Sequence, residues 1–168
     1  LAKKLYLLRN HGLKDRNNCE IFGFNSRLDT VQAVIANYKI QNKLNTITAK
    51  RISNANKLDK LLKNIHHVTI PKRDKKLKEV FHLYQINTKM RDKLMAFLIK
   101  KNVDAKVHYP IPIHLQKASK FLKYKKGDFP VAEEIAKTTL SLPVHEFISS
   151  KEINYMARLI KEFFRSQN

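Results

Sequence analysis

The sequence predicts a mixed α/β chain that begins with long helices and continues as a small α+β layer, a sheet with helices packed on one face. Three observations support this prediction. All five prolines lie at Pro71 or later, so nothing interrupts long helices before that point. Apolar residues recur at three- and four-residue spacing after Ser26. From residue 66 onward, short β-branched and aromatic runs alternate irregularly with helical patterns.

The helical pattern over residues 28–65 is the longest, and it predicts a connecting helix that is kinked or split near residues 39–44. Ser26 can cap its start, because Asp29 three residues later completes a pattern like a capping box. Shorter helices are expected at residues 1–9, 90–100 and 129–137.

The later part of the chain carries strand and cap signals. Asn102 is expected to end the helix before it in a left-handed conformation, which Asn adopts more readily than most residues. Ser149 with Glu152 predicts a capping box that opens a final amphipathic helix. Strands are expected at residues 67–70, 80–87, 105–108 and 138–142.

Charge is the most unusual compositional feature: 34 Lys and Arg against 14 Asp and Glu give a formal net charge of +20. Nucleic acid is the first partner that such a charge suggests. However, 26 of the basic residues are Lys, only 8 are Arg, and they are spread along the whole chain. Arg is the residue that binds phosphates and guanine through two hydrogen bonds. A nucleic-acid-binding module is therefore kept only as an alternative.

Membrane insertion and metal binding have little support in the sequence. The longest apolar run, residues 94–99, is far shorter than the roughly 20 residues that a membrane-spanning helix needs. His108 and His114 are six residues apart across two prolines, and His66 is adjacent to His67. Neither spacing matches a helical zinc site, so no metal is expected.

The lone cysteine, Cys19, cannot form an internal disulfide, and this suits a reducing cytoplasm. Residues 1–9 lack the length and flanks of a signal peptide. Because the chain does not begin with Met, we expect it to be part of a longer protein.

Two segments offer groups suited to binding. Residues 23–29 place an amide, a hydroxyl and a guanidinium at a helix start, where free N–H groups favour an anion. Residues 108–116 hold His, Tyr and Gln on a loop stiffened by two prolines, as binding loops are often built. The alternatives are a simple helix cap with a surface Arg, and a surface loop with a buried Tyr.

Ordered motifs along nearly the whole chain resemble the sugar aminotransferases of the DegT/DnrJ/EryC1/StrS family. They are residues 8–12 (LRNHG), 23–33 (GFNSRLDTVQA), 81–84 (FHLY), 107–116 (VHYPIPIHLQ), 127–133 (GDFPVAE) and 140–143 (LSLP).

This resemblance implies the C-terminal part of an aspartate-aminotransferase-like fold, in an enzyme that uses pyridoxal 5'-phosphate (PLP). Such enzymes transfer an amino group, usually from glutamate, to a nucleotide-linked keto sugar. The implied domains are the end of the large cofactor domain (residues 1–27), the connecting helix (28–65) and a small C-terminal α+β domain (66–168). In the family the Schiff-base lysine lies upstream of the region matched here, so the resemblance implies no catalytic residue in this chain and no activity for it alone.

The resemblance also implies roles for individual residues. Asn25 matches the family's asparagine that reaches across a homodimer to the cofactor phosphate, and Arg27 lies near the same anionic site. His108 and Tyr109 match the loop that approaches the nucleotide sugar. His114 and Gln116, on the same loop, are further candidate substrate-binding residues.

Two alternatives remain open at this point. Within the family, a PLP-dependent nucleotide-sugar dehydratase has a histidine in place of the upstream lysine. Outside it, the alternative is the basic nucleic-acid-binding module.

Overall fold

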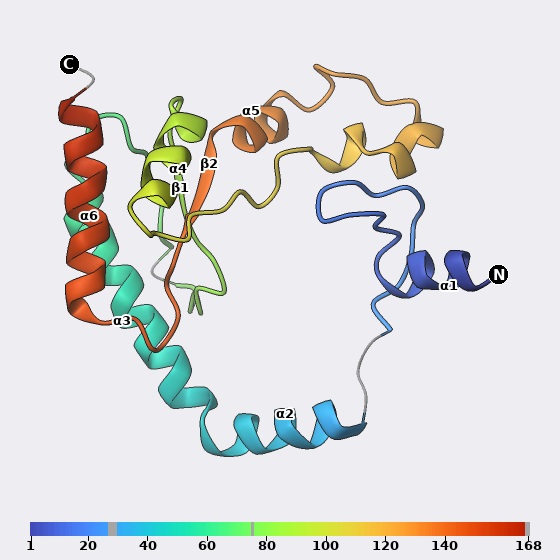
Figure 1. Ribbon diagram of the computed structural model, residues 1–168, viewed down its shortest axis with the longest axis horizontal. Coiled ribbons are helices and arrows are strands. Elements are labelled where there is room, and N and C mark those ends of the chain that lie inside the picture. The colour runs from blue at the N-terminus through green and yellow to red at the C-terminus, as the bar shows by residue number, and fades with distance from the viewer. Residues whose placement is uncertain (27–29, 75, 167–168) are drawn as a thin grey trace. The chain divides into compact units, whose positions relative to one another are not determined.

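The computed structural model describes residues 1–26, 30–74 and 76–166, and the chain forms two compact units (Figure 1). The first unit comprises Leu1–Lys39 and Tyr109–Lys137, and the second comprises Ile40–His108 and Thr138–Asn168. Residues 109–137 thus group with the N-terminal segment, whereas the resemblance placed them in one C-terminal domain with the rest of residues 66–168. The domain boundaries expected from the sequence stay a prediction.

A two-stranded antiparallel sheet lies at the centre of the second unit. It pairs β1 (Tyr84–Asn87) with β2 (Thr139–Leu142), and the register places Gln85 opposite Ser141. Single antiparallel bridges extend it on both sides, from Thr69 to Asn87 and from Lys106 to Ser141.

The strand predictions near residues 67–70 and 105–108 were wrong in extent, because each segment contributes one bridge instead of a strand. Pro71 follows the first segment directly and cannot donate a ladder hydrogen bond. The predicted strand at residues 80–87 starts only at Tyr84, since Phe81 has a φ of 52° and interrupts the extended backbone.

Three helices cover one face of this sheet: α3 (Leu44–Leu62), α4 (Arg91–Lys100) and α6 (Ser150–Arg165). In Figure 1, α3 and α6 run side by side, and their facing side chains form the core. Fully buried side chains from all three helices and both strands meet there: Leu58, Leu62, Tyr84, Ile86, Leu94, Leu98, Leu140, Ile153 and Ile160.

Local signals placed the ends of these elements correctly. Ser149 and Glu152 form the predicted capping box at the start of α6. Asn102, two residues after the end of α4, has a φ of 60°, which confirms the predicted left-handed end. The predicted connecting helix is split at Lys43, between α2 (Thr30–Asn42) and α3. Asp29, the other half of the expected cap at Ser26, lies outside the described residues.

The first unit contains α1 (Ala2–Arg9), two 3-10 turns (Ile113–Leu115 and Lys117–Leu122) and most of α5 (Pro130–Thr138). The segment that carries the two turns lies beside the N-terminal loops, although about 100 residues separate them in the sequence (Figure 1). In the described part of the chain, no helix is both long enough and apolar enough to span a membrane.

Candidate functional site

Asn25 lies on an extended stretch that runs back along the end of α1. Its backbone forms an antiparallel bridge with Asn10, while the Ser26 N–H donates to the Arg9 carbonyl at 3.2 Å. Asn25 itself is exposed, so its amide is presented from a fixed backbone. Arg27, the second residue of the predicted anion site, lies outside the described residues.

Two glycines make this arrangement possible. A Cβ on Gly12, whose φ is 71°, would lie 1.6 Å from the Ile21 carbonyl oxygen. A Cβ on Gly23 would lie 2.5 Å from the Gly12 nitrogen and 2.6 Å from the Leu8 carbonyl oxygen. Real Cβ atoms do not approach backbone atoms this closely, so both positions require glycine for the loop to pack against α1.

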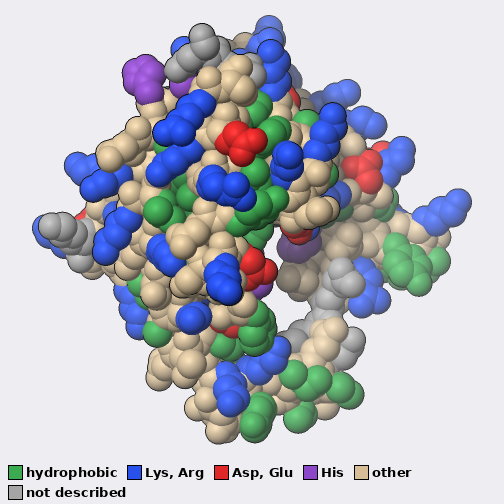
Figure 2. Space-filling model, turned by 60° about the vertical axis from the view of Figure 1, so that its left-hand side comes forward, with side chains coloured by type: hydrophobic (Ala, Val, Ile, Leu, Met, Phe, Trp, Pro, Cys, Tyr) green, Lys and Arg blue, Asp and Glu red, His purple; other side chains and the backbone are tan. Residues whose placement is uncertain are grey.

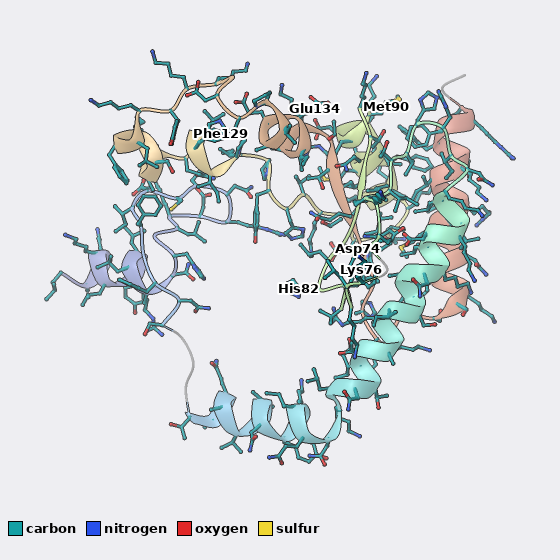
Figure 3. The ribbon with its side chains drawn as sticks, turned by 180° about the vertical axis from the view of Figure 1, so that it is seen from behind. Asp74, Lys76, His82, Met90, Phe129 and Glu134 are labelled. Carbon is teal, nitrogen blue, oxygen red and sulfur yellow. The ribbon has the colours of Figure 1, made fainter. Side chains whose placement is uncertain are left out.

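Tyr109 and His114 line one apolar cavity of about 530 Å³ in the first unit. Isoleucines, aromatic side chains and one proline form most of its wall, and Phe129, labelled in Figure 3, lies on the segment that leads into α5. The Tyr109 side chain is 61% exposed and can contact a ligand, whereas a buried Tyr was the alternative reading of this loop.

His114 is held inside the protein instead of being presented to solvent. Its Nε2 lies 3.0 Å from Oε1 of Glu133, and both side chains are only 8% exposed. The Gly127 N–H donates to the same carboxylate oxygen at 2.7 Å. This hydrogen bond holds the pKa of Glu133 below its ordinary value, although burial acts in the opposite direction.

Gln116 joins two distant parts of the sequence within the first unit. Its Oε1 accepts from the Cys19 N–H at 3.1 Å, and its Nε2 donates to the Asn17 carbonyl at 3.2 Å. The side chain is partly buried and already engaged at both ends. Gln116 therefore fixes the loop at residues 13–20 against the turn that follows His114.

His108 is the last residue of the Ile40–His108 segment of the second unit, and it is anchored to the sheet. Its Nδ1 lies 2.9 Å from Oγ of Ser141, and its carbonyl accepts from Nε2 of Gln85 at 3.0 Å. His108 lines a cavity of about 210 Å³ with Ser141, with the basic side chains of Arg51, His82, Lys106 and His145, and with Asp104, which forms an ion pair with Lys106. His82 stands on the loop before β1 (Figure 3).

The structure thus gives the five candidate residues that it describes different surroundings. Tyr109 and His114 line the same cavity of the first unit. Gln116 fixes a loop of that unit and Asn25 lies on another of its loops, whereas His108 belongs to the second unit. Among the described residues, no group of three or more His, Cys, Asp or Glu side chains could hold a metal ion.

Sequence reasoning missed three polar residues that contact the candidates: Gln85, Glu133 and Ser141. One signal was available for Ser141, because it lies between Leu140 and Leu142 and must point to the opposite face of the strand. The pairing of Glu133 with His114, 19 positions away, left no local signal.

Comparison with known proteins assigns the family. The sequence model of the DegT/DnrJ/EryC1/StrS aminotransferase family matches residues 1–161. The chain belongs to this family. The expectation drawn from the motifs is therefore confirmed, and the match extends over almost all of the described residues.

Two relatives and one solved structure illustrate the similarity. The chain is 37% identical to the pleiotropic regulatory protein of Geobacillus stearothermophilus, over 98% of this chain and 45% of that protein. It is 32% identical to dTDP-3-amino-3,4,6-trideoxy-alpha-D-glucose transaminase of Streptomyces venezuelae, over 86% of this chain and 38% of that protein. The crystal structure of S. venezuelae DesV superposes with a TM-score of 0.77 at 28% identity, covering 96% of this chain and 43% of DesV.

These coverages mean that the chain spans less than half the length of the relatives it matches. This share agrees with the expectation that it corresponds to the C-terminal part of an aspartate-aminotransferase-like fold. The fold similarity to DesV confirms the predicted mixed α/β fold class.

Proposed function

We propose that this chain is the C-terminal part of a PLP-dependent aminotransferase that transfers an amino group from glutamate to a nucleotide-linked keto sugar. One observation carries the proposal: a relative named as a dTDP-amino-sugar transaminase aligns with 86% of this chain at 32% identity. The similar fold of DesV supports it.

The residues of this chain fit the phosphate group of the implied cofactor. Asn25 is exposed on a backbone fixed by its bridge to Asn10, and a side-chain amide can donate to a phosphate oxygen. PLP, when bound, supplies a conjugated ring that withdraws electrons from the reacting carbon. In the proposal Asn25 and Arg27 hold the cofactor phosphate of the neighbouring subunit in a homodimer, while the lysine that binds PLP belongs to the upstream part of the enzyme.

His108 and Tyr109 are the proposed contacts to the nucleotide sugar. The exposed Tyr109 ring offers a stacking surface and a hydroxyl, and the cavity beside His108 offers further hydrogen-bonding groups on His82 and His145. His114 and Gln116 take part by holding the loop between them, because both side chains are engaged in internal contacts.

The basic surface fits this role better than nucleic-acid binding. Figure 2 shows Lys and Arg scattered over the visible face, without the single continuous stripe that tracks a nucleic-acid backbone. We further place the enzyme in the cytoplasm, where a thiol such as Cys19 stays reduced.

The experiment uses the full-length parent enzyme with added PLP. We expect more than one equivalent of 2-oxoglutarate per bound PLP to form only when glutamate and a nucleotide-linked keto sugar are both present. Loss of a hydroxyl from the sugar, with no amino group gained by the sugar, would instead identify a dehydratase. Binding of nucleic acid with a steep dependence on salt, and no turnover, would favour the nucleic-acid-binding module.

A further inference from the structure

His108 is held at three points by two neighbouring strands. Lys106, two residues earlier, exchanges both backbone hydrogen bonds with Ser141: Ser141 N–H to Lys106 O at 2.7 Å and Lys106 N–H to Ser141 O at 3.1 Å. The His108 carbonyl accepts from Gln85 Nε2, and the imidazole Nδ1 contacts Ser141 Oγ. The backbone before the histidine, its carbonyl and its ring are therefore all fixed.

These contacts come from one cross-strand pair. Gln85 of β1 and Ser141 of β2 lie directly opposite each other in the register, and opposite residues of an antiparallel pair point to the same face. The pairs on either side, Tyr84 with Leu142 and Ile86 with Leu140, point to the other face and into the core. The sheet is apolar toward its helices and presents hydroxyl and amide groups toward His108.

The chemistry of Ser141 suits a positioning role. A serine hydroxyl can donate to an unprotonated Nδ1 or accept from a protonated one, so the contact persists in both neutral tautomers and in the imidazolium. Ser141 is only 4% exposed, so water competes little for its hydroxyl. A carboxylate in its place would stabilise the imidazolium strongly, whereas a hydroxyl orients the ring without fixing its charge.

We propose that Ser141 is a positioning residue for His108, fixing the imidazole through Nδ1 so that the ring meets the nucleotide sugar in one orientation. This inference rests on the proposed function, because it assigns Ser141 an effect on a substrate contact. Pre-orientation reduces the side-chain freedom that would otherwise be lost when the ligand binds.

The test uses four variants of the full-length enzyme: Ser141→Ala, His108→Ala, the double variant, and Thr139→Val as a matched control. Thr139 lies two positions before Ser141 in β2, on the same face, and is also buried. Removing its hydroxyl tests the general effect of an apolar substitution in this strand. Melting temperatures verify that each variant folds.

We expect Ser141→Ala to raise the KM for the keto sugar about two- to tenfold, the range for one hydrogen bond, with little change in kcat or in the KM for glutamate. In the His108→Ala background the same substitution should change the KM by less than about twofold, because there is no ring left to orient. Thr139→Val should leave all three constants unchanged.

An equal effect of Ser141→Ala in both backgrounds, or an equal effect of Thr139→Val, would overturn the inference, because Ser141 would then act on the strand in general. An unsubstituted enzyme without transaminase activity would instead overturn the proposed function. In that case, the same cycle is measured by urea unfolding of the full-length protein. Non-additive Ser141 and His108 effects would support the positioning contact, and additive effects would overturn it.

Discussion

Arg73 and Asp59 form an ion pair with two hydrogen bonds, which holds the loop between α3 and β1 against α3. Nε of Arg73 lies 3.2 Å from Oδ2 of Asp59, and its Nη2 lies 3.1 Å from Oδ1. The Tyr84 hydroxyl donates to the same Oδ1 at 2.7 Å, and Nη1 of Arg73 contacts Glu79 at 3.1 Å. The network therefore links the loop, the helix and the first strand of the sheet.

Arg73→Met is expected to destabilise the second unit by about 1–3 kcal/mol, because among the described residues it leaves the partly buried Asp59 carboxylate with one side-chain donor, the Tyr84 hydroxyl. The methionine keeps most of the apolar stem, so the effect comes from the lost guanidinium. Urea unfolding followed by circular dichroism measures the change. Lys76→Met, an exposed lysine on the same loop (Figure 3), is the control and should change stability by less than about 0.5 kcal/mol. Equal effects of the two variants would contradict this account.

Glu133 should make the first unit sensitive to acid. The pKa of its carboxyl is lower in the folded chain than the ordinary value of 4.5. The ionised carboxylate therefore contributes fully to the stability of the folded unit above about pH 4.5, and this contribution is lost as the pH falls through the folded pKa. Amide hydrogen exchange at Gly127, which donates to Glu133, reports this locally. We expect the Gly127 amide to exchange faster in the Glu133→Gln variant than in the unsubstituted chain at neutral pH. This difference should shrink toward pH 3. Glu134→Gln, which removes the same charge from the exposed neighbouring position, should leave Gly127 exchange unchanged.

Asn102 should tolerate glycine better than a β-branched residue. Its φ of 60° lies in the left-handed region, where glycine has no steric penalty and valine is strained. We expect Asn102→Val to lower the free energy of unfolding by about 1–2 kcal/mol and Asn102→Gly to change it by less than about 1 kcal/mol. Thermal unfolding of both variants measures this, and equal destabilisation would show that the backbone conformation is not the cause.

The parts of the fold that could be predicted from sequence are those fixed by neighbouring residues. The capping box of Ser149 and Glu152 spans four positions, and the left-handed Asn102 lies two residues after the helix that it ends. Helical periodicity located α4 to within one residue because it repeats over several turns. Each of these signals needs only local chemistry.

The parts that could not be predicted depend on contacts between distant residues. Strand-like composition at residues 67–70 and 105–108 did not reveal that each would make one bridge, since the partner strands fix how many residues pair. The same holds for the candidate site. His114 and Gln116 stay predicted substrate-binding residues, and their partners Glu133 and Cys19 come from α5 and the N-terminal loop, where no local pattern indicated a contact.

Asn25 is expected to act across the subunit interface of the full-length enzyme. Losing its hydrogen bond to a phosphate should weaken PLP binding roughly 10- to 150-fold, as for a charge-assisted bond of about 1.5–3 kcal/mol. A two-fold dimer gives each active site the loop of the other subunit. Activity should therefore reappear when Asn25→Ala subunits are mixed with subunits that lack the PLP-binding lysine, because one of the two sites in each heterodimer is then intact.

Subunit exchange in that mixture is verified by native mass spectrometry. If heterodimers form and activity does not return, while Asn25→Ala alone lowers only the melting temperature, then Asn25 has a structural role within its own subunit.

Transfer of nitrogen-15 from labelled glutamate to a nucleotide-linked keto sugar tests the central claim most directly. The full-length enzyme with PLP is predicted to yield an amino sugar nucleotide that carries the label, with 2-oxoglutarate formed in equal amount, while the 168-residue chain alone yields none. An unlabelled sugar product, or no product with any nucleotide-linked keto sugar under conditions where PLP is bound, would contradict the assignment as a sugar aminotransferase.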